Sequence, residues 1–271
     1  VITVTSGKGG VGKSNTAINL AIQFRKMGKK VVILDADFGL ANIEIMFGAV
    51  PKHNLSDLIY QGKNIKDIIT WGPMEVGFIS GGSGITGLSN LSKDYLTYIV
   101  HNLAELDTIA DVIIVDTGAG ISDAVLEFLV ASGEILLVTT PEPTSITDSY
   151  SLLKALNGHP GLERDNTQIC MIANRVSSAN EGEVLFQKLD VVVSRYLKLP
   201  ITYLGAVPQD PLLAKAVMQQ LPVSLQNPQA RSAQAYEEIA AKLMKQDEGQ
   251  NTQKRGVAAF FSHIIGKRNN G

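Results

Sequence analysis

The sequence has 271 residues with 24 basic and 26 acidic side chains, and an apolar share of 45% that is typical of a folded chain with a large core. Its formal net charge of −2 argues against a strongly basic, nucleic-acid-binding surface. The single cysteine, Cys170, excludes an internal disulfide and a metal site built from the chain's own cysteines, and we expect it to be a buried strand thiol. No apolar run is long enough to cross a bilayer, so we expect a cytoplasmic protein.

Short runs rich in Val, Ile and Leu alternate with helical patterns along the chain. The runs cover residues 2–6, 31–35, 76–80, 112–116, 134–140, 168–173 and 201–207. Continuous apolar runs are typical of parallel strands that are buried on both faces. We therefore predict an α/β fold with a doubly wound, mostly parallel sheet in three αβα layers, whose ligands bind beyond the carboxyl ends of the strands.

A phosphate-binding motif follows the first predicted strand. Gly7, Gly12, Lys13 and Ser14 match the pattern G-x-x-x-x-G-K-S/T between a strand and a helix, which is the setting that the motif requires. Glycines let backbone N–H groups turn toward phosphates, and the helix N-terminus favours anions. Lys13 would contact the β- and γ-phosphates and the Ser14 hydroxyl would help to hold Mg²⁺. The alternative is a glycine-rich turn with a solvated lysine.

A second lysine, Lys8, stands at the start of the same loop. The stretch "KGGVGKS" resembles the deviant Walker A motif of the MinD/ParA family of P-loop NTPases. The resemblance implies an ATPase that binds ATP/ADP with Mg²⁺ and forms a homodimer on ATP binding, with Lys8 and Lys13 catalytic and Lys8 reaching the partner's nucleotide. The alternative for Lys8 is a bland surface role. The loop residues that would bind nucleotide are Gly7, Lys8, Gly9, Gly10, Val11, Gly12, Lys13, Ser14 and Asn15.

Three aspartates end predicted strands. Asp35 and Asp37 follow residues 31–34, and Asp116 ends the run 112–116 in the manner of a Walker B aspartate. The resemblance implies that Asp37 orients the attacking water, and that Ser14, Asp35 and Asp116 support Mg²⁺. Gly118 would let the following loop approach the γ-phosphate. Alternatively, the first two aspartates cap a turn or a helix.

Further positions match the family's adenine and dimer segments. The resemblance implies nucleotide contacts from Asn174, Arg175, Val207, Pro208 and Asp210, with the Asn174 amide reading the base. It also places Glu142 and Asp148 on the face that meets a dimer or protein partner. Asn174 could instead be an ordinary turn residue, and the two acids could simply stabilise a helix start.

The composition changes near the end of the chain. We expect an ATPase domain over residues 1–245, a polar linker over 246–253 and an amphipathic membrane-targeting segment over 254–271. Apolar residues recur at helical spacing in that last segment, between basic residues, as in helices that lie on anionic membranes. They are Val257, Phe260, Phe261, Ile264 and Ile265, flanked by Lys254, Arg255, Lys267 and Arg268. The alternative is a helix that folds back onto the domain or into a partner's groove.

The branches of the family can be weighed from the residues. Iron–sulfur members need cysteine ligands that this chain lacks, and DNA partitioning is disfavoured because the chain without its last 18 residues is net acidic. The stretches "KSNTAINLAIQFRKMGKK", "NLSDLI" and "FISGGSG" resemble the flagellar-number branch, FlhG, FleN and YlxH. That resemblance implies a slow ATPase, reversibly peripheral at the inner face of the bacterial membrane, which regulates flagellum number or placement. Its implied partners are an FlhF-type signal-recognition GTPase and flagellar basal-body proteins. MinD-type division-site and ParA-type DNA-partitioning functions remain the alternatives.

Overall fold

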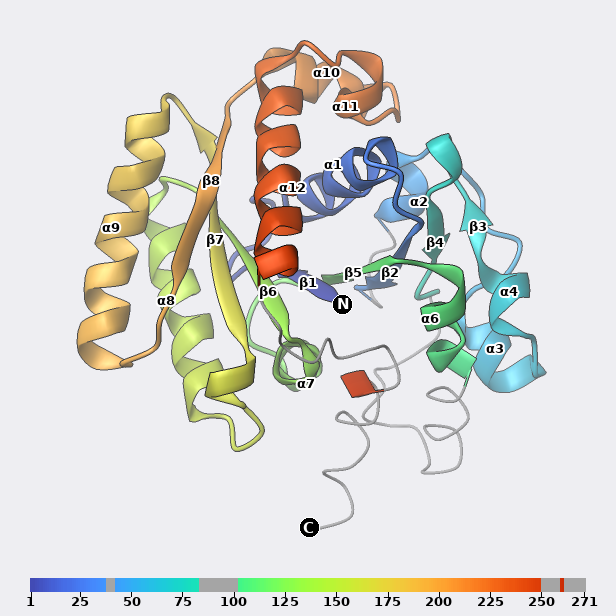
Figure 1. Ribbon diagram of the computed structural model, residues 1–271, viewed down its shortest axis with the longest axis horizontal. Helices are drawn as coiled ribbons and strands as arrows, with labels where there is room; N and C mark the ends of the chain where they lie inside the picture. Colours follow the sequence, from blue (N-terminus) through green and yellow to red (C-terminus); the bar gives the residue numbers. More distant parts are fainter. Residues whose placement is uncertain (38–41, 83–101, 250–258, 261–271) are drawn as a thin grey trace.

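The computed structural model describes residues 1–37, 42–82, 102–249 and 259–260. Its eight strands form one sheet (Figure 1). In chain order the strands are β1 Ile2–Thr5, β2 Val31–Ala36, β3 Thr70–Trp71, β4 Gly77–Ile79, β5 Val112–Thr117, β6 Glu134–Thr139, β7 Gln168–Val176 and β8 Thr202–Pro208. All seven predicted strands are therefore present in the sheet.

The strand order is β3-β4-β2-β5-β1-β6-β7-β8, and every pairing is parallel except that of β3 with β4. The sequence did not predict β3, because two residues at a sheet edge, with Trp71 57% exposed, give no apolar run. The doubly wound, mostly parallel sheet is confirmed.

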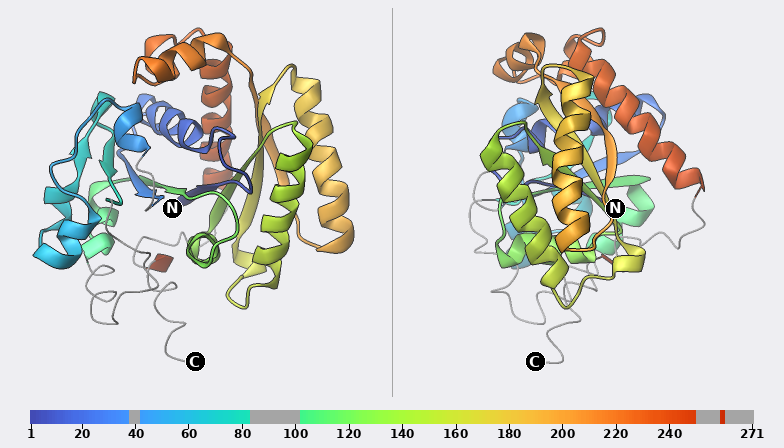
Figure 2. Two further views of the ribbon diagram at one scale, coloured as in Figure 1. Left: turned by 180° about the vertical axis from the view of Figure 1, so that it is seen from behind. Right: turned by 90° about the vertical axis from the view of Figure 1, so that its left-hand side faces the viewer.

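Helices cover both faces of the sheet (Figures 1 and 2). On one face lie α1 Lys13–Lys26, α2 Ile43–Met46, α11 Val223–Gln226 and α12 Arg231–Gly249, with α10 Pro211–Met218 beside them. On the other lie α3 Leu55–Gln61, α4 Ile65–Ile68, α6 Leu106–Ile109, α7 Asp123–Ala131, α8 Pro143–Gly158 and α9 Ala179–Tyr196.

Strand side chains alternate between the two layers, as the two-residue period of a strand requires. In β2, Val31 and Ile33 join the core under α1 and α12, whereas Val32 and Leu34 join the core under α3 and α7. Cys170 on β7 is fully buried, as predicted, and burial raises the pKa of its thiol to about 12. It is therefore a protonated core residue.

The last helix of the domain runs further than the sequence suggested. α12 continues to Gly249, so the segment predicted as a polar linker is helical over its first four residues, 246–249. Gln246 and Glu248 impose only small costs on a helical backbone, whereas Asp247 costs more and Gly249 costs about 1 kcal/mol. A helix already anchored upstream tolerates these costs in its last turn. The remainder of that segment lies outside the described residues.

Candidate functional site

The phosphate loop joins β1 to α1 and leaves the helix N-terminus without a side-chain cap. Gly12 precedes the helix with φ 96°, and Gly10 has φ 75°, backbone conformations that favour glycine. No side chain caps the helix, so the N–H groups of its first turn have no partner of this kind. Such groups, together with the helix dipole, form a binding site for phosphate.

Two glycines of the loop are required by packing as well as by conformation. A Cβ atom on Gly12 would lie 2.3 Å from the Asn174 amide nitrogen, and one on Gly7 would lie 2.2 Å from the carbonyl carbon of Asp148. The loop therefore sits between the end of β7 and the backbone of α8. Gly9 and Gly10 have open space around them, which leaves their backbone accessible to a ligand.

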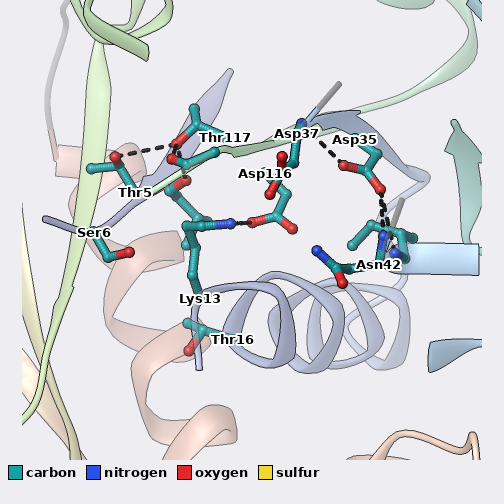
Figure 3. A network of polar contacts seen from close by, with 12 residues as sticks. Thr5, Ser6, Lys13, Thr16, Asp35, Asp37, Asn42, Asp116 and Thr117 are labelled. Atoms are coloured by element: carbon teal, nitrogen blue, oxygen red, sulfur yellow. Dashed lines mark hydrogen bonds and ion pairs between the residues drawn. The ribbon is translucent and has the colours of Figure 1, made fainter. Parts of the chain in front are cut away.

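The acidic residues converge because of the strand order. β2 lies beside β5 with Asp35 opposite Asp116, so two carboxylates from distant parts of the sequence become register partners. The Lys13 ammonium lies 2.9 Å from Asp116 Oδ1 and both side chains are buried (Figure 3). This ion pair places the lysine of the phosphate loop directly against the aspartate near the end of β5.

Asp35 is held by backbone N–H groups just after β2 and at the start of α2. Its Oδ1 accepts a hydrogen bond from the Asp37 N–H at 3.2 Å, and its Oδ2 accepts from those of Asn42 and Ile43 at 3.2 and 3.3 Å (Figure 3). Burial, and then the charge of Asp116, raise the pKa of Asp35 to about 7 despite these hydrogen bonds. This carboxyl group therefore holds its proton to a higher pH than an ordinary aspartate does.

Asp116 is fully buried, and burial raises its pKa, against the opposing effect of the Lys13 charge. Its second oxygen, Oδ2, has no hydrogen-bond partner within the described chain. A buried, unpaired carboxylate oxygen beside Ser14 and a second carboxylate suits a hard divalent cation such as Mg²⁺. Because the described residues contain no group of three or more acidic, His or Cys side chains fit for a metal, phosphate oxygens and water would have to complete its coordination.

Asp37 borders the same cluster. Its charge contributes to the raised pKa of Asp116, and a Cβ atom on Gly118 would lie 3.8 Å from Asp37 Oδ1. The fold thus brings together the phosphate-loop lysine, all three predicted aspartates and the glycine of the loop after β5. The Thr117 hydroxyl, 3.2 Å from both the Thr5 hydroxyl and the Val4 carbonyl, ties that loop to β1 (Figure 3).

Two of the residues predicted to contact adenine, Asn174 and Arg175, lie near the end of β7. The buried Asn174 donates a hydrogen bond of 2.6 Å to the Val11 carbonyl, so its amide supports the phosphate loop. Arg175 is exposed and has φ 58°, at an irregularity in the pairing of β7 with β8. Backbone strain of this kind is frequent at functional sites.

The other predicted adenine residues lie at the end of β8. Val207 is buried and Pro208 is partly exposed. Asp210 accepts a hydrogen bond from the Leu212 N–H at 2.9 Å, and from the N–H and hydroxyl of Ser232 at 3.0 and 2.8 Å. One carboxylate therefore caps both α10 and α12, a role that the sequence did not predict because Ser232 is distant along the chain.

The predicted dimer face lies at the start of α8. Lys8 forms an ion pair with Glu142 and donates a hydrogen bond of 2.8 Å to the Thr144 hydroxyl. Thr144, two residues after Glu142, was not among the predicted residues, because its partner Lys8 is distant along the chain. Asp148 lies partly exposed on the same helix, where its backbone packs against Gly7.

Among the residues of the predicted membrane stripe, the structure describes Phe260. It is fully buried in the core between the sheet and α7, where its ring stacks with that of Phe128 at a centroid distance of 6.0 Å. Val257, Phe261, Ile264, Ile265, Lys267 and Arg268 lie outside the described residues. No helix in the described ranges is long and apolar enough to cross a membrane.

The ParA family model, described as a NUBPL iron-transfer P-loop NTPase, matches residues 1–244. The chain is 39% identical to antiactivator FleN of Pseudomonas aeruginosa over 90% of its own length and 85% of FleN. It is 34% identical to flagellum site-determining protein YlxH of Helicobacter pylori, over 97% of this chain and 89% of YlxH. The structure also resembles septum site-determining protein MinD of Pyrococcus horikoshii, solved with Mg-ADP, with a TM-score of 0.69 at 23% identity and coverage of 91% of this chain and 96% of the other.

Proposed function

The chain belongs to the ParA/MinD family of P-loop NTPases, and we propose on this premise that it is a Mg²⁺-dependent ATPase that regulates flagellum number or placement. One observation supports the proposed ATPase activity. The uncapped start of α1 lies at the same edge of the sheet as Lys13, Asp35 and Asp116. The flagellar part is supported by the similarity to FleN and YlxH over most of both proteins.

The iron-transfer label of the family model does not fit this chain. Its one cysteine, Cys170, is fully buried inside the sheet and its pKa is raised, so the thiolate needed to bind iron is disfavoured. The buried oxygen donors around Asp116 favour a hard cation that accompanies a phosphate. Nucleotide chemistry is therefore the function that these residues support.

In the proposed reaction, backbone N–H groups of residues 9–14 bind the phosphates and Lys13 moves from Asp116 to the β- and γ-phosphates. Ser14 and Asp116, with Asp35 through water, would hold Mg²⁺. The ion would supply positive charge to the phosphate oxygens as the bond from the γ-phosphorus to the bridging oxygen breaks. Asp37 would orient the attacking water. Hydrolysis then consumes one water and yields ADP and phosphate.

Lys8 would complete the site from a second copy of the chain. Negative charge develops on the γ-phosphoryl oxygens in the transition state, and a cation supplied in trans stabilises it as an arginine finger does. ATP binding would thus favour a homodimer, and hydrolysis would release it. Hydrolysis would be slow without an activating partner, as suits a switch that must persist in its ATP state. We include an FlhF-type GTPase and flagellar basal-body proteins among the proposed partners.

The C-terminal segment would link nucleotide state to the membrane. Phe260 belongs to the apolar stripe but is buried against Phe128, which supports a segment that can dock on the domain. Its release on dimerisation would present two basic, apolar segments to one anionic surface, and two weak anchors bind far more tightly together than one. The protein would then alternate between the cytoplasm and the inner face of the membrane.

The test is co-sedimentation with anionic liposomes, together with oligomeric state and phosphate release. We expect dimers and sedimentation with a non-hydrolysable ATP analogue and Mg²⁺, but not with ADP, and loss of sedimentation when the chain ends before Lys254. Asp37→Ala should keep ATP-dependent dimers while abolishing turnover. If instead DNA retains the protein and liposomes do not, the membrane role is wrong and the DNA-partitioning alternative gains support.

A further inference from the structure

Lys8, the residue proposed to act on a partner's nucleotide, is engaged within its own chain. Its ammonium forms an ion pair with the Glu142 carboxylate and donates to Thr144 Oγ1 at 2.8 Å. An ammonium has three donors, so two of them are committed to the first turn of α8. The side chains of Lys8 and Glu142 remain 32% and 53% exposed, so the ammonium can leave without opening the core.

The backbone fixes where Lys8 lies. The Ser6 hydroxyl donates a hydrogen bond of 2.9 Å to the Lys8 carbonyl, and Gly7 packs directly against the α8 backbone at Asp148. Both contacts hold the start of the phosphate loop against α8. Lys8 can therefore exchange partners only by swinging its side chain, while its Cα atom stays beside Glu142 and Thr144.

Glu142 is placed to receive a cation rather than to cap its helix. It occupies the N-cap position of α8, where a polar side chain usually accepts from the helix backbone, yet it makes no such hydrogen bond. Pro143 follows at the first helical position. The hydrogen bond and charge of Lys8 lower the pKa of Glu142, so the carboxylate is ionised at neutral pH.

We propose that Glu142 and Thr144 are positioning residues that retain Lys8 in its own subunit and thereby oppose ATP-dependent dimerisation. This inference rests on the proposed function, because it takes Lys8 to act across a dimer. In this proposal the ammonium leaves Glu142 and Thr144 when it reaches the nucleotide of a second copy. Each dimer would break two such contacts, so the pair raises the protein and ATP concentrations at which dimers form.

The size of the effect follows from the exposure of the pair. Ion pairs at a surface are weak and are screened by salt, so the contact would adjust the dimerisation equilibrium and not block it. Removing the carboxylate would shift the equilibrium between bound and released Lys8 roughly threefold toward release in each subunit. Because each dimer contains two such lysines, its dissociation constant would fall about tenfold. Loss of the Thr144 hydroxyl would have a smaller effect, because it removes a neutral acceptor.

The experiment measures the dimer dissociation constant by sedimentation velocity with a non-hydrolysable ATP analogue and Mg²⁺, at low and high salt. Glu142→Gln keeps the size of the side chain and removes its charge, and Thr144→Val removes the hydroxyl. Glu237→Gln, at an exposed position on α12, is the charge-matched control. We expect tighter dimers for Glu142→Gln, a smaller shift for Thr144→Val and none for the control. The difference between Glu142→Gln and the wild type should shrink at high salt.

Two results would overturn the inference, and they differ. If the wild type dimerises but Glu142→Gln dimerises equally or more weakly, with an unchanged thermal midpoint, Glu142 does not restrain Lys8 and the inference alone is wrong. If neither the wild type nor any variant dimerises with the analogue, the proposed function fails and the inference fails with it. Lys8→Ala should prevent dimers in both the wild-type and Glu142→Gln backgrounds.

Discussion

At the scale of single residues, the site is an arrangement of buried charges that the chain by itself does not neutralise. Asp35 and Asp116 are register partners, and Lys13 is the ion partner of Asp116 in the described chain. Two carboxylates and one ammonium leave an excess of negative charge in a region that water does not solvate. Burial raises the pKa values of both carboxyl groups, and for Asp35 the charge of Asp116 adds to this effect. The excess negative charge favours a bound cation.

The first prediction concerns pH. The pKa of Asp35 is about 7 in the folded chain against an ordinary value of 3.8, so the folded state binds the proton more tightly than the unfolded state does. Stability from this group is complete below pH ~4 and is lost as the pH rises through 7. Without nucleotide and metal, the thermal midpoint of the wild type should therefore fall more steeply from pH 5.5 to pH 8 than that of Asp35→Asn. Parallel slopes would contradict the prediction.

The second prediction concerns Gly12, where conformation and space both require glycine. Gly12→Ala would cost about 1–2 kcal/mol for the left-handed backbone, and its Cβ would also displace the Asn174 amide from Val11. Gly28→Ala is the matched control, because φ is +82° there and nothing lies within 4 Å of the added atom. Urea denaturation should show a larger loss of stability for Gly12→Ala. Equal losses would mean that the Asn174 contact contributes nothing.

At the scale of elements, buried and partly buried polar contacts join the phosphate-loop helix to α11 and α12. Along one face of α1, Asn19 accepts from the Ser224 N–H at 3.0 Å, Gln23 donates to the Ser224 hydroxyl at 3.2 Å and Lys26 donates to the Ser224 carbonyl at 2.6 Å. Gln23 also donates to the Ala233 carbonyl at 3.1 Å. α11 and α12 are thus positioned directly by the helix that begins at the phosphate loop.

The third prediction tests this connection. Asn19→Ala leaves the N–H of Ser224 buried without its acceptor, which should cost about 1–3 kcal/mol of unfolding free energy. The exposed Asn180, at the start of α9, provides the control Asn180→Ala, for which a much smaller change is expected. Denaturant titrations of both variants measure the difference. A cost for Asn19→Ala no larger than for the control would show that the network is energetically neutral.

The fourth prediction concerns Phe260 and α7. The stacked rings of Phe260 and Phe128 should couple by about 0.5–1.5 kcal/mol in a double-mutant cycle of Phe260→Ala and Phe128→Ala. Phe260→Ala should also make trypsin cleavage at Lys254 and Arg255 faster in the nucleotide-free chain, because the docked segment would lose an anchor. Additive effects with unchanged proteolysis would argue that the segment does not dock through this pair.

At the scale of the whole molecule, stability and ligand binding depend on the same site. A ligand that binds only the folded chain stabilises it by about 2.7 kcal/mol at a hundredfold excess over its dissociation constant. ADP with Mg²⁺ should therefore raise the thermal midpoint, and EDTA should reduce this gain. The gain should be larger at pH 8 than at pH 5.5, because Asp35, whose pKa is about 7, is largely ionised at the higher pH and then adds negative charge beside the cation. If the rise in thermal midpoint depends on neither EDTA nor pH, the metal does not bind beside Asp35 and Asp116.

The strands, the phosphate loop and the ends of β2 and β5 could be predicted from the sequence because their signals are local. An apolar run, a glycine spacing and an aspartate after a strand are properties of neighbouring residues, and the family resemblance rests on the same short stretches. The edge strand β3 gave no such signal, since two half-exposed residues have no periodicity. The contacts of Asn174, Asp210 and Thr144 also could not be predicted, because their partners are distant in the sequence.

Local patterns in the chain thus account for the parallel sheet, the phosphate loop and the acidic strand ends. Tertiary structure decided which groups meet there. The placement of β2 beside β5 made Asp35 the neighbour of Asp116. The packing of the loop on α8 gave Lys8 a partner in its own chain, and the burial of Phe260 turned a residue of the predicted membrane stripe into a core residue. Each outcome depends on long-range packing and desolvation, which no local pattern of residues specifies.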